Sequence, residues 1–190
     1  MPKNVILIGD SIRMGYQPVV TELLSGSATV WGPSDNCFTT RHTLERLDEW
    51  VIQRRPVVVH WNNGLHDLAK DPPQRDQSRV SLDEYVTNLR KMLKRMRDAG
   101  AVVIWATITP VNQDNHQRNK PFVRLEADVS FYNSAALALM REEKVPVDDL
   151  HDVITQAGRD ELLLEDGVHY TPEGYRLLGQ AVAAAIRPWL

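Results

Sequence analysis

Short apolar runs alternate along the chain with segments whose apolar residues recur at helical spacing. The runs are rich in Val and Ile and do not alternate with polar residues, which is typical of strands buried on both faces of a sheet. Five runs are therefore expected to form strands: Val5–Ile8, Ala28–Trp31, Val57–Trp61, Val102–Ala106 and the weaker Val145–Val147.

Apolar residues three or four positions apart predict helices between these runs. The segment Leu82–Ala99 follows Ser81, an expected N-cap with Glu84 three residues later, and it ends before Gly100. The final helix is expected to begin after Thr171 and to reach about Ile186, with Pro172 in its first turn. The other predicted helices are Pro18–Leu24, Thr43–Gln53 and Phe122–Glu143.

This alternation of strands and helices predicts an α/β fold with a mostly parallel sheet, and 190 residues suit a single domain over 1–190. Two polar segments, Lys70–Arg79 and Pro110–Pro121, follow predicted strand ends. Ligands bind outside the carboxyl ends of strands in open parallel sheets, so these segments are candidate walls of a site. Solvated connections are the equally weighted alternative.

Composition and charge exclude several classes of protein. The formal net charge is −3 and no basic stripe is present, which argues against a nucleic-acid partner. No apolar run reaches the roughly 18 residues that span a bilayer, so no membrane association is expected. The single cysteine, Cys37, cannot form an intrachain disulfide, and no signal peptide is visible, so a cytoplasmic location is expected unless a leader has been trimmed away.

Ser11 is the first candidate for chemistry. It lies in Gly9-Asp10-Ser11, directly after the first predicted strand, where amide N–H groups of a strand-to-helix turn can face a developing negative charge. A serine nucleophile also needs a base within hydrogen-bond reach and a group that orients the base. Taken alone, the stretch is better explained as an ordinary turn.

Asp166 and His169 can supply the base and its orienting group. They lie three residues apart in the stretch DGVH, with Gly167 between them, just before the final helix. A tight turn there lets the carboxylate meet Nδ1 of the imidazole and leaves Nε2 free to face a serine. HExxH and close Cys/His pairs are absent, so His60, His66 and Asp67 are not expected to bind a metal, and no cofactor is expected.

GDS near the amino terminus and DGVH near the carboxyl terminus of an alternating α/β chain resemble the SGNH hydrolases, also called GDSL esterases/lipases. The resemblance runs from Val5 to about Ile186. It implies a flavodoxin-like three-layer α/β/α sandwich with a mostly parallel central sheet. It also implies that Ser11 is the nucleophile, His169 the general base and acid, and Asp166 its orienting partner.

The middle of the chain departs from the family pattern, and the oxyanion hole is the part affected. The usual Gly of the second block is replaced by Cys37, whose N–H remains, with Gly32 as a second candidate. The usual GxND block reads Gly64-Leu65-His66-Asp67, which puts His66 at the Asn position. Expected donors are therefore the N–H groups of Ser11 and Cys37, and a side chain. That side chain is Asn62 by preference (Asn63 being its neighbouring alternative), with His66 next.

The resemblance implies a serine esterase that hydrolyses a small soluble carboxylic ester through an acyl-enzyme. Polar loops and the lack of an apolar lid favour acetyl esters of carbohydrates. Two alternatives remain. A non-catalytic ligand-binding domain on this scaffold is suggested by the altered middle motifs, and an acyltransferase would use the same three residues.

Overall fold

The computed structural model describes residues 3–190 and contains a five-stranded sheet in which every pair of strands is parallel. The strand order is β2-β1-β3-β4-β5, which is the flavodoxin-like order. The strands are β1 Lys3–Ile8, β2 Ala28–Trp31, β3 Val58–Trp61, β4 Val102–Ala106 and β5 Val147–Asp148. The predicted fold class and all five strand positions are confirmed, with β5 displaced toward Asp148.

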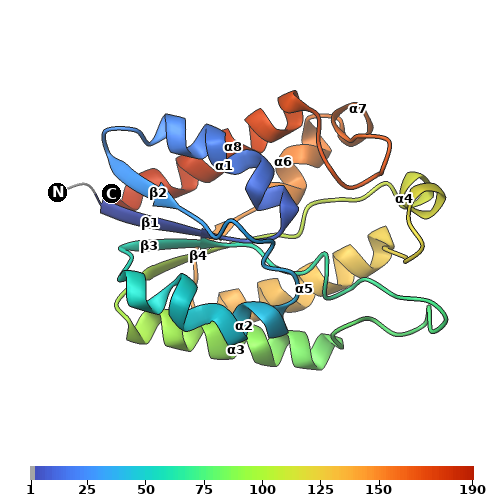
Figure 1. Ribbon diagram of the computed structural model, residues 1–190, viewed down its shortest axis with the longest axis horizontal. Coiled ribbons are helices and arrows are strands. Elements are labelled where there is room, and N and C mark those ends of the chain that lie inside the picture. Colours follow the sequence, from blue (N-terminus) through green and yellow to red (C-terminus); the bar gives the residue numbers. More distant parts are fainter. Residues whose placement is uncertain (1–2) are drawn as a thin grey trace.

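Helices cover both faces of the sheet, which gives the predicted three layers (Figure 1). One face carries α1 (Ser11–Leu23), α6 (Leu150–Gln156) and α8 (Pro172–Ile186). The other carries α2 (Thr40–Trp50), α3 (Leu82–Asp98) and α5 (Glu126–Glu142). The short helices α4 (Gln113–Asn119) and α7 (Arg159–Leu162) lie at one end of the molecule, and 3₁₀ turns occupy Ile52–Arg54 and Arg187–Trp189.

The central strands β1 and β3 form the middle of the core. Residues 5–8 and 58–61 are completely buried, as expected for strands covered by helices on both faces. No helix among residues 3–190 is long and apolar enough to cross a membrane.

The prediction for α1 was wrong about where the helix begins. We expected a helix over Pro18–Leu24 with Pro18 in its first turn, but α1 begins at Ser11 and contains Pro18 in its interior. The Asp10 side chain accepts a hydrogen bond from Ile12 N at 2.9 Å and caps the helix seven residues earlier than expected. This shift places Ser11 at the first position of a helix.

Other differences lie at helix ends and in the polar segments. The segment 110–121 was expected to be a loop, but Asn112 caps α4 by accepting a hydrogen bond from Asn115 N at 3.1 Å. The following helix, α5, starts at Glu126 and not at Phe122, and α2 lies three residues earlier than predicted. The short helices α6 and α7 were not predicted. The caps at Ser81 and Thr171 are confirmed, and Lys70–Arg79 contains no helix or strand.

Candidate active site

The amino terminus of α1 brings Ser11 to the carboxyl end of the central strand β1. Ser11 is the first residue of the helix, and backbone N–H groups of a first helical turn have no intrahelical acceptor. The positive end of the helix dipole is also located there. The position therefore offers a hydroxyl beside a backbone donor and a field that favours negative charge.

The side chains of Ser11, His169 and Asp166 form one hydrogen-bonded series. The Ser11 Oγ lies 2.8 Å from His169 Nε2, and His169 Nδ1 lies 2.6 Å from Asp166 Oδ2. All three residues are partly exposed, so a solvent-borne molecule can reach the hydroxyl. The structure thus brings together the three residues that the sequence singled out from opposite ends of the chain.

The turn that carries Asp166 and His169 is held by its own backbone. Asp166 Oδ1 accepts hydrogen bonds from the N–H groups of Val168 (3.0 Å) and His169 (2.9 Å). Burial by itself raises the pKa of Asp166, but hydrogen bonds from the His169 ring and these two N–H groups outweigh it and lower the pKa to about 2. Asp166 is therefore ionised and able to stabilise an imidazolium at neutral pH.

Gly167 lets this turn lie directly against α4. Its φ is +72°, and a Cβ there would lie 2.3 Å from the Asn112 carbonyl oxygen, so a side chain fits neither the conformation nor the space. Asn112 N donates to the Gly167 carbonyl at 2.8 Å. The His116 Nδ1 donates to the Asp166 carbonyl at 3.3 Å, and burial lowers the pKa of His116 to about 4, which keeps it neutral. Helix α4, which the sequence did not predict, thus positions Asp166 and His169.

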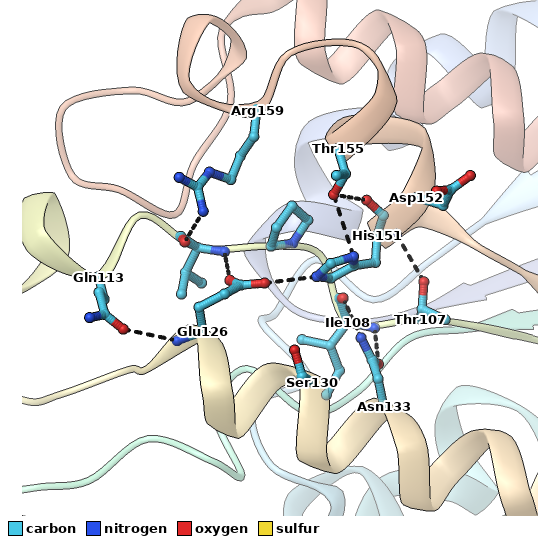
Figure 2. A network of polar contacts seen from close by, with 12 residues as sticks. Thr107, Ile108, Gln113, Glu126, Ser130, Asn133, His151, Asp152, Thr155 and Arg159 are labelled. Atoms are coloured by element: carbon cyan, nitrogen blue, oxygen red, sulfur yellow. Dashed lines mark hydrogen bonds and ion pairs between the residues drawn. The ribbon is translucent and has the colours of Figure 1, made fainter.

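Glu126 in turn holds the segment that leads into α4 (Figure 2). Its Oε2 accepts a hydrogen bond from Val111 N at 2.7 Å, and its Oε1 lies 2.8 Å from His151 Nε2. Arg159 donates to the Val111 carbonyl at 3.2 Å. The Thr155 hydroxyl beside His151 donates to the His151 carbonyl at 2.8 Å, so this network braces the backbone and does not resemble an activated nucleophile.

We expect Glu126→Ala to lower the free energy of unfolding by about 1–3 kcal/mol, because it leaves Val111 N–H without its acceptor. For a chain of this size that corresponds to a fall of roughly 2–12 °C in the melting temperature, measured by calorimetry. Glu45→Ala, at an exposed position of α2, is the matched control and should stay within about 0.5 kcal/mol of wild type. Equal melting of the two variants would show that Glu126 does not brace this segment.

Two of the expected oxyanion donors form hydrogen bonds within the fold. The N–H of Cys37 donates to the Gly9 carbonyl at 3.2 Å. The Asn62 amide donates to the carbonyls of Ala106 (3.3 Å) and Thr107 (3.0 Å), and Asn62 is only 3 % exposed. Both donors hold loops around the sheet in this structure.

Asn63, the alternative beside Asn62, also forms hydrogen bonds within the fold. The Asn63 amide donates to the Phe38 carbonyl at 3.2 Å, and its oxygen accepts from the Trp61 ring at 2.8 Å. Gly32 packs against Gln17 in the wall of a cleft of about 770 Å³ between α1 and the segment after β2. Of the candidate side-chain donors, His66 is the one left free.

His66 is half-buried beside His169. Burial lowers the pKa of His66 to about 4, and the charges of Arg124, Arg79 and His169 act in the same direction against an opposing effect of Asp10. Its Nδ1 lies 3.4 Å from an Arg79 nitrogen, and its Nε2 has no hydrogen-bond partner in the part of the chain that the structure describes, residues 3–190. The His66 imidazole is therefore neutral at neutral pH, with one ring nitrogen free of hydrogen-bond partners among residues 3–190.

The next residue, Asp67, holds the loop in place through hydrogen bonds. Its Oδ1 accepts hydrogen bonds from Thr40 N (2.9 Å) and Thr40 Oγ1 (2.5 Å), which ties the His66 loop to the start of α2. Burial raises the pKa of Asp67 to about 7 in spite of these bonds. Within residues 3–190 no three His, Cys, Asp or Glu side chains are grouped as metal ligands would be.

Sequence reasoning missed Arg79 and Arg124, which surround His66. Arg124 is only 5 % exposed, and its Nε donates to the Leu65 carbonyl at 2.7 Å. Both guanidinium groups lie against the Phe122 ring, at 4.8 Å for Arg79 and 5.0 Å for Arg124. Arg79 lies at the end of a predicted polar segment and Arg124 at the start of a predicted helix, and no local pattern marks either residue as part of a site.

A hydroxyl, an imidazole and a carboxylate hydrogen-bonded in series at the carboxyl end of a parallel sheet have the geometry of a serine hydrolase site. The chain belongs to the GDSL-like lipase/acylhydrolase family, whose sequence model matches residues 7–177. The chain is therefore a member of a hydrolase family, and the resemblance drawn from its motifs is confirmed.

Similar proteins agree with this membership. The isoamyl acetate-hydrolyzing esterase of Saccharomyces cerevisiae is 27% identical over 149 residues, which cover 74% of this chain and 61% of the yeast protein. A bovine homologue of that esterase is 27% identical over 90% of this chain and 76% of its own length. The crystal structure of a lipase/acylhydrolase from Enterococcus faecalis has the same fold, with a TM-score of 0.83, 24% identity, and coverage of 98% of this chain and 96% of that one.

Proposed function

We propose that this protein is a serine esterase that hydrolyses a small carboxylic ester through an acyl-enzyme. The observation that carries the proposal is the series from Ser11 Oγ through the His169 ring to Asp166, with steps of 2.8 and 2.6 Å. The alternative of a non-catalytic binding domain has no use for such a series.

The first half-reaction forms the acyl-enzyme. Ser11 Oγ attacks the ester carbonyl while His169 Nε2 takes its proton, and ionised Asp166 stabilises the resulting imidazolium. The carbonyl oxygen becomes an oxyanion, which receives hydrogen bonds from the Ser11 N–H and from Nε2–H of His66. The tetrahedral intermediate collapses when His169 gives its proton to the leaving alcohol.

Water completes the cycle in the second half-reaction. His169 Nε2 takes a proton from the water as its oxygen attacks the acyl carbonyl, and the same two donors hold the second oxyanion. Collapse releases the carboxylic acid, and the proton returns from His169 to Ser11 Oγ. No metal or organic cofactor takes part in this scheme.

We propose short acyl groups, acetyl in particular, as the acyl part of the substrate. The yeast relative is named for hydrolysis of isoamyl acetate, and the polar segment 70–79 beside the site offers little apolar surface to a long acyl chain. We expect kcat/KM for p-nitrophenyl acetate to exceed that for p-nitrophenyl octanoate by about tenfold or more. Equal or faster hydrolysis of the octanoate would overturn this assignment.

Labelling with a fluorophosphonate, followed by intact mass, tests the proposed nucleophile. Wild type should form a single adduct, Ser11→Ala should form none, and Ser134→Ala, at an exposed serine of α5, should react like wild type. Absence of an adduct in wild type would instead favour a binding domain on this scaffold.

A further inference from the structure

The imidazole of His66 differs from the usual Asn of the GxND block in which of its nitrogens carry N–H donors. An Asn amide group carries two N–H donors whatever its surroundings, whereas a neutral imidazole carries a proton on only one of its two nitrogens. A histidine that serves as an oxyanion donor therefore needs a neighbour that selects the correct tautomer.

Arg79 can act as this neighbour, because its guanidinium lies close to the His66 ring and can only donate hydrogen bonds. Its guanidinium nitrogen lies 3.4 Å from His66 Nδ1, and a guanidinium can only donate, so Nδ1 must be the acceptor and the proton must lie on Nε2. His66 Nε2 is the ring nitrogen without a partner among residues 3–190, as noted above. The free nitrogen is thus the protonated one.

The Arg79 guanidinium is itself held in place. Two of its nitrogens, Nε and Nη2, donate to the two Asp71 carboxylate oxygens, each at 2.7 Å, and its central carbon lies 4.8 Å from the centre of the Phe122 ring. Its backbone N–H donates to the Ala69 carbonyl at 2.9 Å. A bidentate ion pair of this kind fixes the direction of the third nitrogen, which is the one that faces His66.

The His66 ring is also constrained from its other sides. Phe38 packs against it with ring centroids 4.8 Å apart, and the bond from Arg124 holds the preceding carbonyl of Leu65. Charges of Arg79, Arg124 and His169 oppose a second proton on the ring, against Asp10, which favours it. Together with burial, they keep the pKa near 4, so the ring is neutral and singly protonated at neutral pH.

We propose that Arg79 is a positioning residue that selects the Nε2–H tautomer of His66 and aims this donor at the oxyanion. The inference rests on the proposed function, because it assigns His66 to the oxyanion hole of that reaction. It adds a role for Arg79, and for its partner Asp71, which act on the reaction through His66.

Kinetics in two backgrounds test this role. We expect Arg79→Met to lower kcat about tenfold or more, with KM within about twofold, bounded by the 10²–10³ loss typical of a missing oxyanion donor. In the His66→Asn background, where the donor needs no tautomer, the same substitution should change kcat by less than about twofold. Arg79→Lys retains a donor and should keep more activity than Arg79→Met, whereas Arg90→Met, at a distant surface ion pair, should have no effect.

Nitrogen-15 NMR of the His66 ring supplies a readout that does not depend on activity. Wild type at about pH 7 should show the Nε2–H form, and Arg79→Met should show a mixture of tautomers or a higher pKa for His66. Equal losses of kcat in both backgrounds, or an unchanged Nε2–H signal in Arg79→Met, would overturn the proposal. Failure of the proposed function would appear separately, as fluorophosphonate labelling or esterase activity that persists in Ser11→Ala.

Discussion

Replacing His169 with alanine is expected to lower kcat by about 10⁶, which leaves the rate that substrate binding and the oxyanion donors supply. Ser11 Oγ lies 2.8 Å from His169 Nε2 and has no other hydrogen-bond partner among residues 3–190. Without His169 nothing takes the proton of the attacking hydroxyl or returns one to the leaving alcohol. The measurement is kcat on p-nitrophenyl acetate, with circular dichroism to verify the fold.

The double variant provides the control for this prediction. Groups that act in one step do not have additive effects, so Ser11→Ala combined with His169→Ala should be no slower than either single variant. The remaining rate would come from substrate binding and the oxyanion donors. A loss of only about tenfold in His169→Ala would mean that another group serves as the base, and the proposed mechanism would be wrong.

Asp166→Asn is expected to lower kcat by about 10⁴ while KM stays within a few fold. The amide has the same shape as the carboxylate, but its NH₂ group would face His169 Nδ1, now 2.6 Å from Asp166 Oδ2. The imidazole would then carry its proton on Nε2 and could not accept one from Ser11. A decrease below about tenfold would show that the backbone of the turn alone orients His169.

The same variant tests the pKa of Asp166 through stability. Because its folded pKa is about 2, below the usual value of about 3.9, the carboxylate stabilises the fold above about pH 4 and loses this effect as the pH falls through 2. The side chain is 23% exposed, so we expect at most about 2 kcal/mol after solvent screening.

Wild type should therefore unfold with a higher free energy than Asp166→Asn near pH 6, and the difference should shrink toward pH 2. Urea unfolding at several pH values measures it. A difference that does not vary with pH would contradict the low pKa.

Local patterns were sufficient to predict the fold class and the three residues of the hydrogen-bonded series. Buried parallel strands have a composition that differs from that of exposed ones, so β1, β3 and β4 were recognisable as apolar runs. Asp166 and His169 are three residues apart with a glycine between them, and their contact is a property of one turn. Ser11 needed only its place after the first strand and the resemblance of GDS to a family motif.

The oxyanion donors depended on the tertiary structure. Cys37 and Asn62 carry suitable donors, but carbonyl groups of Gly9, Ala106 and Thr107, which are distant in sequence, accept them. No local pattern records which carbonyl lies nearby. The start of α1 is different: it is fixed by a local hydrogen bond from Ile12 N to the Asp10 side chain, which the prediction from Pro18 overlooked.

The sequence by itself therefore determined the layered parallel fold and the Ser11, His169 and Asp166 series, because each depends on neighbours within one strand, one turn or one motif. Only the tertiary structure decided that His66 is the free donor, that α4 supports the Asp166 turn, and that Arg79 faces His66 Nδ1. The contact between His66 and Arg79 joins residues 13 positions apart, and the contact between His116 and Asp166 joins residues 50 positions apart. Their hydrogen bonds form only when the packing of the sheet and its loops brings the two partners within about 3.5 Å.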